Sequence, residues 1–340
     1  MTTATVLEHR GLPYRRAGAT GLLLPAFSLG LWQGFGSDRD QRTQASLITG
    51  AFDRGVTHFD NANRYGPPFG WAERVLGEVL RTELAAHRDE ITITTKAGRP
   101  VGDHPYAVGG SRKHLLDAVD TGLARLGTDH VDVFYHHAYD PGTPLEETAT
   151  ALADIARQGK ARYLGLSNYP AAPLAEIVAL LRELRAPLAL VQPGYSLLDR
   201  AAEEPGGVLD IAAEAGLGVV VYSPLAQGRL TTKYLDGAVP ATSRAAWSTF
   251  LDGTFIDDAY LATVGRLDEA ARARGASLPQ AALQWVLRRP EVTSVLLGAS
   301  RLEQLDENLG ALRVAELTEA DADELEAIAS GTAAERVLAR

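Results

Sequence analysis

Cysteine is absent from the 340-residue chain. Disulfides, thiolate catalysis and cysteine-ligated metal sites are therefore excluded. Long apolar runs are also absent, since none approaches the ~18 residues that a membrane-spanning helix needs. The N-terminus, "MTTATVLEHRGLPYRRAG", lacks the apolar segment of a signal peptide. We therefore expect a soluble cytoplasmic protein that does not enter the membrane.

An excess of positive charge is missing too. The chain has 33 Lys and Arg against 43 Asp and Glu, which gives a net charge of -10. Non-specific nucleic-acid binding needs a basic surface, so no nucleic-acid partner is expected. A pocket for a small anion remains possible, because a few local basic residues can line one. The 46% hydrophobic and 22% charged content is ordinary for a globular chain with a large core.

Eight short strand-like runs alternate with helical segments. Each run is apolar or β-branched and is bounded by Gly, Pro or a polar cluster. The runs are "AFSLG", "THFD", "ITITTK", "VDVFYH", "YLGLS", "LALVQ", "GVVVYS" and "TSVLLG". The helical segments between them include "RTQASLITGAFDRG", "AERVLGEVLRTEL", "PLEETATALADIARQGK", "APLAEIVALLRELR" and "GGVLDIAAEAG". A further one, "SRKHLLDAVDTGLARLG", has Ser111 as a predicted N-cap and Gly127 as a stop.

This alternation predicts parallel βαβ units, and eight of them predict a closed (β/α)8 TIM barrel in the α/β class. We expect one domain over residues 1–340. A β-hairpin at "PYRRAGATGLLL" would cap the bottom of the barrel, and "TEADADELEAIASG" would form a last helix capped by Thr318. Two long segments, 98–110 and 223–257, interrupt the alternation, and long loops in a compact domain are usually functional.

Polar residues follow most of the predicted strands. Active sites of such barrels lie at the C-terminal ends of the strands. Many of these polar residues could simply cap a helix or form a turn. Lys96 differs, because a Lys that closes a β-branched run has no capping role and should point into the barrel mouth. The residues at these ends are Asp60, Lys96, His136, His137, Ser167, Asn168, Gln192, Tyr222 and Ser223.

A Lys, a carboxylate and a Tyr in one cavity have a chemical use. Burial disfavours a charged Lys96, so Asp60 would hold it as an ammonium. That ammonium would lower the pKa of Tyr65 toward neutrality, and a tuned Tyr can protonate a developing alkoxide. Adjacent strand residues face opposite sides, so only one of His136 and His137 can join them. For the same reason the pair cannot ligate one metal ion, and no metal is expected.

Several motifs together resemble the aldo-keto reductase family, from about Tyr14 to Ala329. They are "FDNANRYG", "VDVFYHH", "GLSNY", "VQPGYS", "VVVYSPLAQGRL" and "LLGASRLEQLDENL". "YGPPFGWAERVLGEVLR" and "GGSRKHLLDAVDTGLARLGTDHVDVFY" are most similar to the branch that holds bacterial L-glyceraldehyde 3-phosphate reductases and potassium-channel β subunits. The resemblance implies a catalytic tetrad of Asp60, Tyr65, Lys96 and His137. The channel subunits carry Asn at the His position, so the retained His137 favours an active reductase.

The resemblance also implies an NADPH cofactor, bound without the glycine-rich motif of dinucleotide folds. Ser167, Asn168 and Gln192 would hold the nicotinamide carboxamide, with Tyr222 stacked on the ring and Trp32 nearby. The segment 223–234 would fold over the pyrophosphate, with Arg244 near the adenine and its ribose phosphate. From its residue type alone, Trp32 could equally be an ordinary aromatic residue of the core or of the barrel rim. The segment contributes Ser223, Pro224, Leu225, Gln227, Gly228 and Lys233.

The stretch "GASRLEQLDENL" is expected to bind the adenosine end of the cofactor. Gly298, Ala299 and Ser300 would begin a helix whose first amides face an anion. By resemblance, Ser300, Arg301 and Gln304 would meet the 2′-phosphate, while Glu307 and Asn308 would bind the adenine. A cation at a helix start is unfavourable unless an anion is present, which favours NADP over NAD. Without the resemblance, the stretch is also typical of an ordinary helix N-terminus, and Lys233 could equally be a solvent-exposed loop residue.

The resemblance implies reduction of a small aldehyde or ketone, such as L-glyceraldehyde 3-phosphate or methylglyoxal, with Tyr65 as the general acid. Aromatic walls from Phe69, Trp71 and Tyr139, together with the loop 98–110, would close the pocket. Arg64, Arg99 and Arg112 are candidates for a substrate phosphate. Relatives in this branch imply a homotetramer or a larger ring.

Two other functions remain open at this stage. A class I aldolase uses a strand-end Lys as a Schiff base, which Lys96 could provide. An NADPH-binding, redox-sensing regulatory subunit with slow turnover would need the cofactor site but little catalysis.

Overall fold

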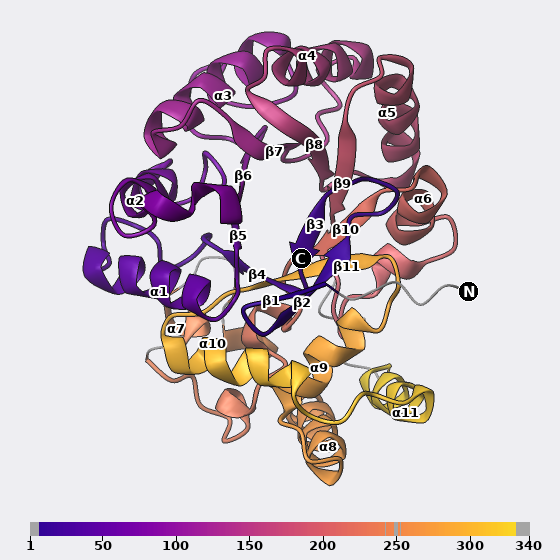
Figure 1. The fold of residues 1–340 in the computed structure, drawn as a ribbon. Helices are drawn as coiled ribbons and strands as arrows, with labels where there is room; N and C mark the ends of the chain where they lie inside the picture. Colours follow the sequence, from indigo (N-terminus) through magenta and orange to yellow (C-terminus); the bar gives the residue numbers. More distant parts are fainter. Residues whose placement is uncertain (1–6, 242, 248–250, 252, 331–340) are drawn as a thin grey trace.

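The computed structural model describes residues 7–241, 243–247, 251 and 253–330. Its centre is a closed barrel of eight parallel strands, in the order β10-β11-β4-β5-β6-β7-β8-β9. Helices surround this barrel (Figure 1). The predicted (β/α)8 barrel is confirmed, while the division into a single domain over 1–340 stays a prediction.

All eight predicted strands form the barrel, with ends shifted by two residues at most. Their registers align the polar strand ends at one end of the barrel: Gly30 pairs with Asp60, and Ser167 pairs with Gln192. The strands are β4 (Phe27–Gly30), β5 (His58–Asp60), β6 (Thr92–Ala97), β7 (Val131–His136), β8 (Ala161–Ser167), β9 (Leu188–Gln192), β10 (Gly218–Val221) and β11 (Val292–Leu297).

The predicted outer helices are also present, and their caps explain their ends. The Ser111 side chain accepts a hydrogen bond from the His114 amide, and Gly127 ends the same helix at φ 67°. Thr318 and Asp321 form a reciprocal capping box. The helices are α1 (Gln41–Asp53), α2 (Trp71–Arg81), α3 (Arg112–Leu126), α4 (Leu145–Arg157), α5 (Ala171–Glu183), α6 (Val208–Ala215), α10 (Leu302–Leu309) and α11 (Glu319–Ala329).

Two helices that the sequence analysis did not name, α8 (Asp258–Ala273) and α9 (Leu278–Leu287), lie between the second long segment and β11. Within the described part of that segment the chain forms short helices. They are η3 (Ala226–Gly228), η4 (Thr232–Tyr234), α7 (Arg244–Trp247) and η5 (Gly253–Phe255). Three more short helices occur elsewhere: η1 (Ala85–Glu90), η2 (Ala201–Glu203) and η6 (Gly310–Leu312).

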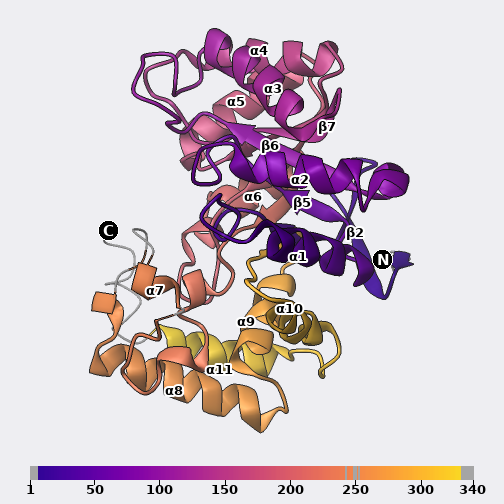
Figure 2. The same cartoon turned by 90° about the vertical axis from the view of Figure 1, so that its left-hand side faces the viewer.

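The predicted N-terminal hairpin is present and gains a third strand. β1 (Leu7–His9), β2 (Leu12–Arg16) and β3 (Leu23–Pro25) form an antiparallel sheet. Tyr14 Oη and Thr57 Oγ1 share a hydrogen bond of 2.5 Å, and Arg15 donates to the carbonyls of Leu287 and Val292. These bonds fasten the sheet across one end of the barrel, opposite the end where α7 lies (Figure 2).

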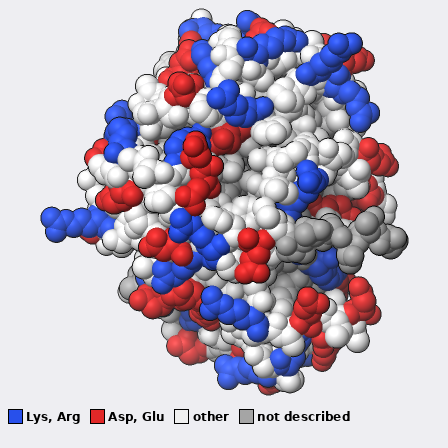
Figure 3. Space-filling view, in the orientation of Figure 1, with Lys and Arg blue, Asp and Glu red and all other residues white. Residues whose placement is uncertain are grey.

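The outer surface mixes charges of both signs. On the face shown in Figure 3, Lys and Arg side chains are interspersed with Asp and Glu. Within the described ranges, none of the helices combines the length and the apolar character that crossing a bilayer would require.

Candidate active site

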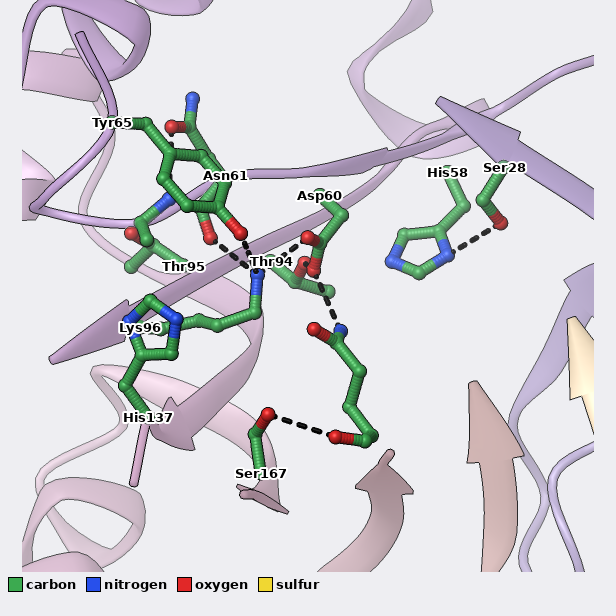
Figure 4. A network of polar contacts seen from close by, with 12 residues as sticks. Ser28, His58, Asp60, Asn61, Tyr65, Thr94, Thr95, Lys96, His137 and Ser167 are labelled. Atoms are coloured by element: carbon green, nitrogen blue, oxygen red, sulfur yellow. Dashed lines mark hydrogen bonds and ion pairs between the residues drawn. The ribbon is translucent and has the colours of Figure 1, made fainter. Parts of the chain in front are cut away.

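Lys96 is the centre of a buried polar group at the end of β6. Its side chain is fully buried, and its ammonium forms an ion pair with Asp60. The same nitrogen donates to the Asn61 carbonyl at 2.9 Å and to Tyr65 Oη at 3.2 Å. All three N–H groups of the ammonium therefore have acceptors (Figure 4).

Asp60, on β5, receives further donors. Thr94 Oγ1 and Gln192 Nε2 donate to its Oδ1 at 2.8 and 3.0 Å. Burial lowers the pKa of Lys96, and the Asp60 carboxylate opposes that shift. An ion pair with its hydrogen bonds satisfied is the form in which two buried charges can persist.

Beneath this pair, inside the barrel, lies a second buried polar layer. Ser28 Oγ bonds His58 Nδ1 at 2.8 Å and Ser294 Oγ at 2.5 Å. His58 lies two residues before Asp60 on β5, so both face the interior. Burial lowers the pKa of His58 to about 4, so this imidazole is neutral at ordinary pH.

The expected lowering of the Tyr65 pKa is wrong. Burial and then the Asp60 carboxylate raise the pKa of Tyr65 well above its usual value. The charge of Arg99 lowers the pKa of the phenol, but burial and the Asp60 carboxylate outweigh it. Tyr65 is therefore a protonated phenol. Because the Lys96 ammonium donates to Oη, the O–H group of the phenol is directed away from Lys96.

The two adjacent histidines at the end of β7, His136 and His137, face different surroundings, as expected. His137 lines the cavity, and its ring centroid lies 6.0 Å from that of Tyr65 in an edge-on arrangement. Burial, followed by the charges of Lys96 and Arg99, holds the pKa of His137 well below its ordinary range. His136 instead bonds Tyr169 Oη through Nδ1 at 2.5 Å. His137 thus presents a neutral imidazole to the cavity.

A cavity of about 880 Å³ extends from this polar group to α10. Asp60, Tyr65 and His137 line its inner end, while Lys96 lies behind them. Every residue predicted to contact a cofactor also lines it: Trp32, Ser167, Asn168, Gln192, Tyr222, Ser223, Pro224, Leu225, Gln227, Gly228, Lys233, Arg244, Gly298, Ser300, Arg301, Gln304, Glu307 and Asn308.

Near the tetrad the cavity wall is cross-linked by hydrogen bonds. Asn168 Nδ2 donates to the His137 carbonyl at 2.8 Å and to Ser167 Oγ at 2.9 Å. Tyr222 Oη donates to Asn168 Oδ1 at 2.8 Å, and Ser167 Oγ donates to the Gln192 carbonyl at 2.8 Å. Asn168 adopts a left-handed φ of 53°, which Asn tolerates better than most residues. These hydrogen bonds fix the side chains of this polar wall relative to one another.

The far end of the cavity is cationic. Burial lowers the pKa of Lys233, and the charges of Arg244 and Arg301 lower it further. The Arg244 guanidinium lies 5.5 Å from the centre of the Trp32 ring. Three cations near one another in a cavity fit a polyanionic ligand, because an anion would relieve their repulsion.

The backbone beside these cations is contorted. Ser223, Ala226 and Gln227 have φ of 54°, 46° and 60°, and Gly228 has φ of 94°. Left-handed conformations of non-glycine residues cost about 1–3 kcal/mol each and cluster at ligand sites. A Cβ at Gly228 would lie 2.7 Å from Lys233 Nζ. The glycine therefore lets Lys233 lie against the loop.

Comparison with known proteins decides the family. The sequence profile of the aldo/keto reductase family matches residues 26–330. The chain belongs to this family. It is 47% identical over 305 residues to the L-glyceraldehyde 3-phosphate reductase of Escherichia coli strain K12, which covers 88% of each chain. It is also 36% identical over 323 residues to a probable voltage-gated potassium channel subunit beta of Oryza sativa subsp. japonica, covering 93% and 96% of the two chains.

Membership of the aldo/keto reductase family confirms that the protein is an oxidoreductase that uses a nicotinamide cofactor. The residue types at both ends of the cavity fit such a group. Within the described part of the reductase, no three His, Asp or Glu side chains are grouped as a metal site would need.

The aromatic residues expected to close the pocket of this reductase do not line the cavity. Phe69 is 46% exposed, and the Arg64 guanidinium lies 5.7 Å from its ring. Trp71 begins α2 and packs on the core, and Tyr139 packs against Tyr169 at 5.6 Å. That expectation is not met: Trp71 and Tyr139 pack against neighbouring elements, and Phe69 lies exposed beside Arg64. From the loop 98–110, only Arg99 reaches the cavity.

The sequence analysis missed cavity residues of the reductase near the start of α1. They follow β4 and include the Asp40 cap, whose side chain accepts from the Thr43 amide at 2.8 Å. An Asp three residues before a Thr at a helix start was the available signal, but it predicts only a helix start. The missed residues of this segment are Gln33, Gly34, Phe35, Arg39, Asp40, Thr43, Gln44 and Leu47.

Proposed function

We propose that the protein reduces short aldehydes such as L-glyceraldehyde 3-phosphate or methylglyoxal to the alcohol with NADPH, with Tyr65 as the general acid. The contact between Lys96 Nζ and Tyr65 Oη, 3.2 Å long and at the inner end of the cavity, carries this proposal. The 47% identity to an L-glyceraldehyde 3-phosphate reductase supports the substrate class.

Each member of the tetrad has a distinct role in this reaction. The bound nicotinamide supplies a hydride to the carbonyl carbon of the aldehyde. Tyr65 gives its phenol proton to the carbonyl oxygen as negative charge develops there. Lys96 stabilises the phenolate left on Tyr65, since its ammonium already donates to Oη. Asp60 keeps that ammonium charged inside the barrel.

His137 orients the substrate in the proposed reaction. A neutral imidazole can donate one N–H to the carbonyl oxygen without competing with Tyr65 as an acid. The lowered pKa of His137 keeps the ring in that form.

NADPH is proposed over NADH on the basis of the cationic end. Arg301 lies at the first turn of α10, where the helix dipole disfavours a cation unless an anion binds there. Ser300 is held beside it, because its amide and its hydroxyl both donate to Gln304 Oε1 at 2.9 Å. The Glu303 carboxylate lies 3.8 Å from Arg301 Nε, in an exposed ion pair. A 2′-phosphate between Ser300 and Arg301 would add a second anion at this helix start.

The direct test follows the loss of NADPH absorbance with a panel of short aldehydes, repeated with NADH. The panel contains both enantiomers of glyceraldehyde 3-phosphate, glyceraldehyde and methylglyoxal. We expect turnover with NADPH and a clear preference among the aldehydes. Tight NADPH binding with no turnover on the whole panel would overturn the proposal.

The relation to channel β subunits supports a second candidate, a cofactor-binding regulatory subunit. Slow turnover with NADP retained through gel filtration would favour it. The aldolase alternative is disfavoured by Lys96 itself, because its three N–H groups are engaged and it lies behind the cavity wall. Borohydride trapping with an aldehyde but without NADPH tests this, and no covalent adduct is expected.

A further inference from the structure

Two arginines line the cavity beside the tetrad, at the end away from α10. Arg64 follows the polar cluster after β5, and Arg99 follows β6. Both are half-buried. Arg64 Nη1 donates to the Pro100 carbonyl at 2.9 Å, which fastens it to the residue next to Arg99. The two guanidinium groups are thereby brought to the same wall of the cavity.

The charges of these arginines reach the reacting groups. The Arg99 charge lowers the pKa of Tyr65, His137 and Tyr222. It opposes the effect of burial at the two tyrosines and adds to it at His137. Arg64 contributes to the lowered pKa of His137. A group that acts on all three side chains lies close to the place where the substrate carbonyl would bind.

No carboxylate in the cavity wall neutralises the two arginines. Asp60 is committed to Lys96, Asp40 caps α1, and Glu307 lies on α10 at the cationic end. Within the described ranges, Arg99 forms no ion pair or hydrogen bond.

Arg112 shows the contrast. It was the third candidate for a substrate phosphate, and it lies on α3 outside the cavity with its Nη1 2.6 Å from Asp154 Oδ2. The chain has 43 acidic and 33 basic residues, so most arginines can find a carboxylate partner. Two arginines without a carboxylate partner at the cavity wall therefore distinguish this part of the structure.

Guanidinium groups bind phosphate through paired N–H donors in a fixed fork. In a three-carbon aldehyde phosphate, the phosphate group is carried on the carbon two bonds from the carbonyl carbon. With the carbonyl oxygen on Tyr65 and His137, that phosphate falls on the neighbouring wall. We propose that Arg99, assisted by Arg64, forms an anion subsite that binds the phosphate of a short phosphorylated aldehyde. This inference rests on the proposed reductase function.

The test compares kcat/KM for glyceraldehyde 3-phosphate with kcat/KM for glyceraldehyde, since the two differ only in the phosphate. The wild-type ratio should exceed one. Arg99→Gln should lower the ratio about 10- to 100-fold, the range for a lost charge-assisted hydrogen bond. Arg99→Lys should keep part of it, and Arg64→Gln should lower it less. Arg112→Gln is the matched control and should leave the ratio unchanged.

The ratio is the right readout because Arg99 also acts on Tyr65. Removing its charge changes proton transfer for both aldehydes equally, and the ratio cancels that effect. A wild-type ratio of one or below would overturn the subsite, as would an Arg99→Gln ratio equal to wild type. A preference for glyoxylate that vanishes in Arg99→Gln, with none for the phosphate ester, would overturn the assignment to phosphate.

A binding measurement keeps the subsite testable if no aldehyde is reduced. Calorimetry would titrate inorganic phosphate into the NADP-loaded protein. Binding that is lost in Arg99→Gln and kept in Arg112→Gln supports the subsite even when the proposed reduction fails. Equal binding by both variants overturns it even when the reduction succeeds.

Discussion

Tyr65 Oη, in the loop that follows β5, lies 3.2 Å from Lys96 Nζ on β6, with the phenol as acceptor and the ammonium as donor. The phenol keeps its own proton because burial and Asp60 raise its pKa. The pair is therefore set to release a proton only when negative charge appears on a substrate oxygen.

Replacing Tyr65 by Phe should separate catalysis from binding. The variant loses the acid but keeps the ring in its buried position, so turnover should fall about 100- to 10,000-fold. NADPH affinity, measured by quenching of protein fluorescence, should change little. Tyr139→Phe is the matched control and should keep full turnover, because Tyr139 packs on Tyr169 outside the cavity. Normal activity in Tyr65→Phe would remove the assigned acid.

Asp60→Asn should destabilise the barrel more than the double substitution Asp60→Asn with Lys96→Met, which removes both charges. The substitution leaves a buried ammonium without its counter-ion, which costs about 3–5 kcal/mol of unfolding free energy. Adding Lys96→Met should restore part of that loss, since the double variant buries no charge. Urea unfolding of the two variants and wild type checks this. A double variant less stable than Asp60→Asn would contradict the ion-pair account.

Buried neutral histidines predict a fall of stability in mild acid. The pKa values of His58 and His136 are lowered by burial to about 4, against 6.5 in an unfolded chain. Between those values the unfolded state binds more protons, so unfolding free energy drops as pH falls, by about 1.4 kcal/mol per pH unit for each His. Above 6.5 these two groups contribute no slope.

Urea unfolding at intervals from pH 7 to pH 4.5 measures that slope. His58→Asn keeps a partner for Ser28 but cannot be protonated, so its slope should be flatter by one proton. The exposed His104 offers the control, and His104→Gln should keep the wild-type slope. Equal slopes for His58→Asn and wild type would show that His58 is not buried in its neutral form.

Arg301→Ala should weaken NADPH much more than NADH. If Arg301 meets the 2′-phosphate, its loss removes a charge-assisted contact that NADH lacks, about a 10- to 100-fold loss of NADPH affinity. Titration of both cofactors into wild type and variant gives the comparison. Arg313→Ala, an exposed Arg just after η6, serves as control. A similar loss for both cofactors would detach Arg301 from the 2′-phosphate.

The barrel and the tetrad geometry could be predicted because their signals are local. Strand runs bounded by Gly and Pro gave the eight strands, and a Lys at a strand end has few structural uses. Two helices went unnamed although Asp257 caps α8 and a capping box at Ser277 and Gln280 begins α9. Both caps are local signals in the sequence, but α8 directly follows the long irregular segment 223–257, so no strand marks where it begins.

The remaining errors concern residue environments and contacts that only the three-dimensional structure reveals. The direction of the Tyr65 pKa shift depends on burial and on the opposing charges of Asp60 and Arg99. The contact of Arg244 with Trp32 joins residues more than two hundred positions apart, and no local pattern encodes it. Likewise Arg99 and Arg112 look alike in sequence, and only the fold separates the cavity wall from the outer helix. The predicted tetramer or larger ring and the cytoplasmic location stay predictions.

The three-stranded sheet at the barrel's closed end also bears on practical handling of the enzyme. Tyr14 and Arg15 bind it to the barrel, and the cavity is lined by residues at the other end of the strands and by the loops that follow them. If the protein is attached to a solid support through β1, the entrance of the cavity would therefore face the solution. Attachment at that end should leave diffusion of cofactor and aldehyde unobstructed, whereas attachment through the segment around α7 would press the entrance against the surface.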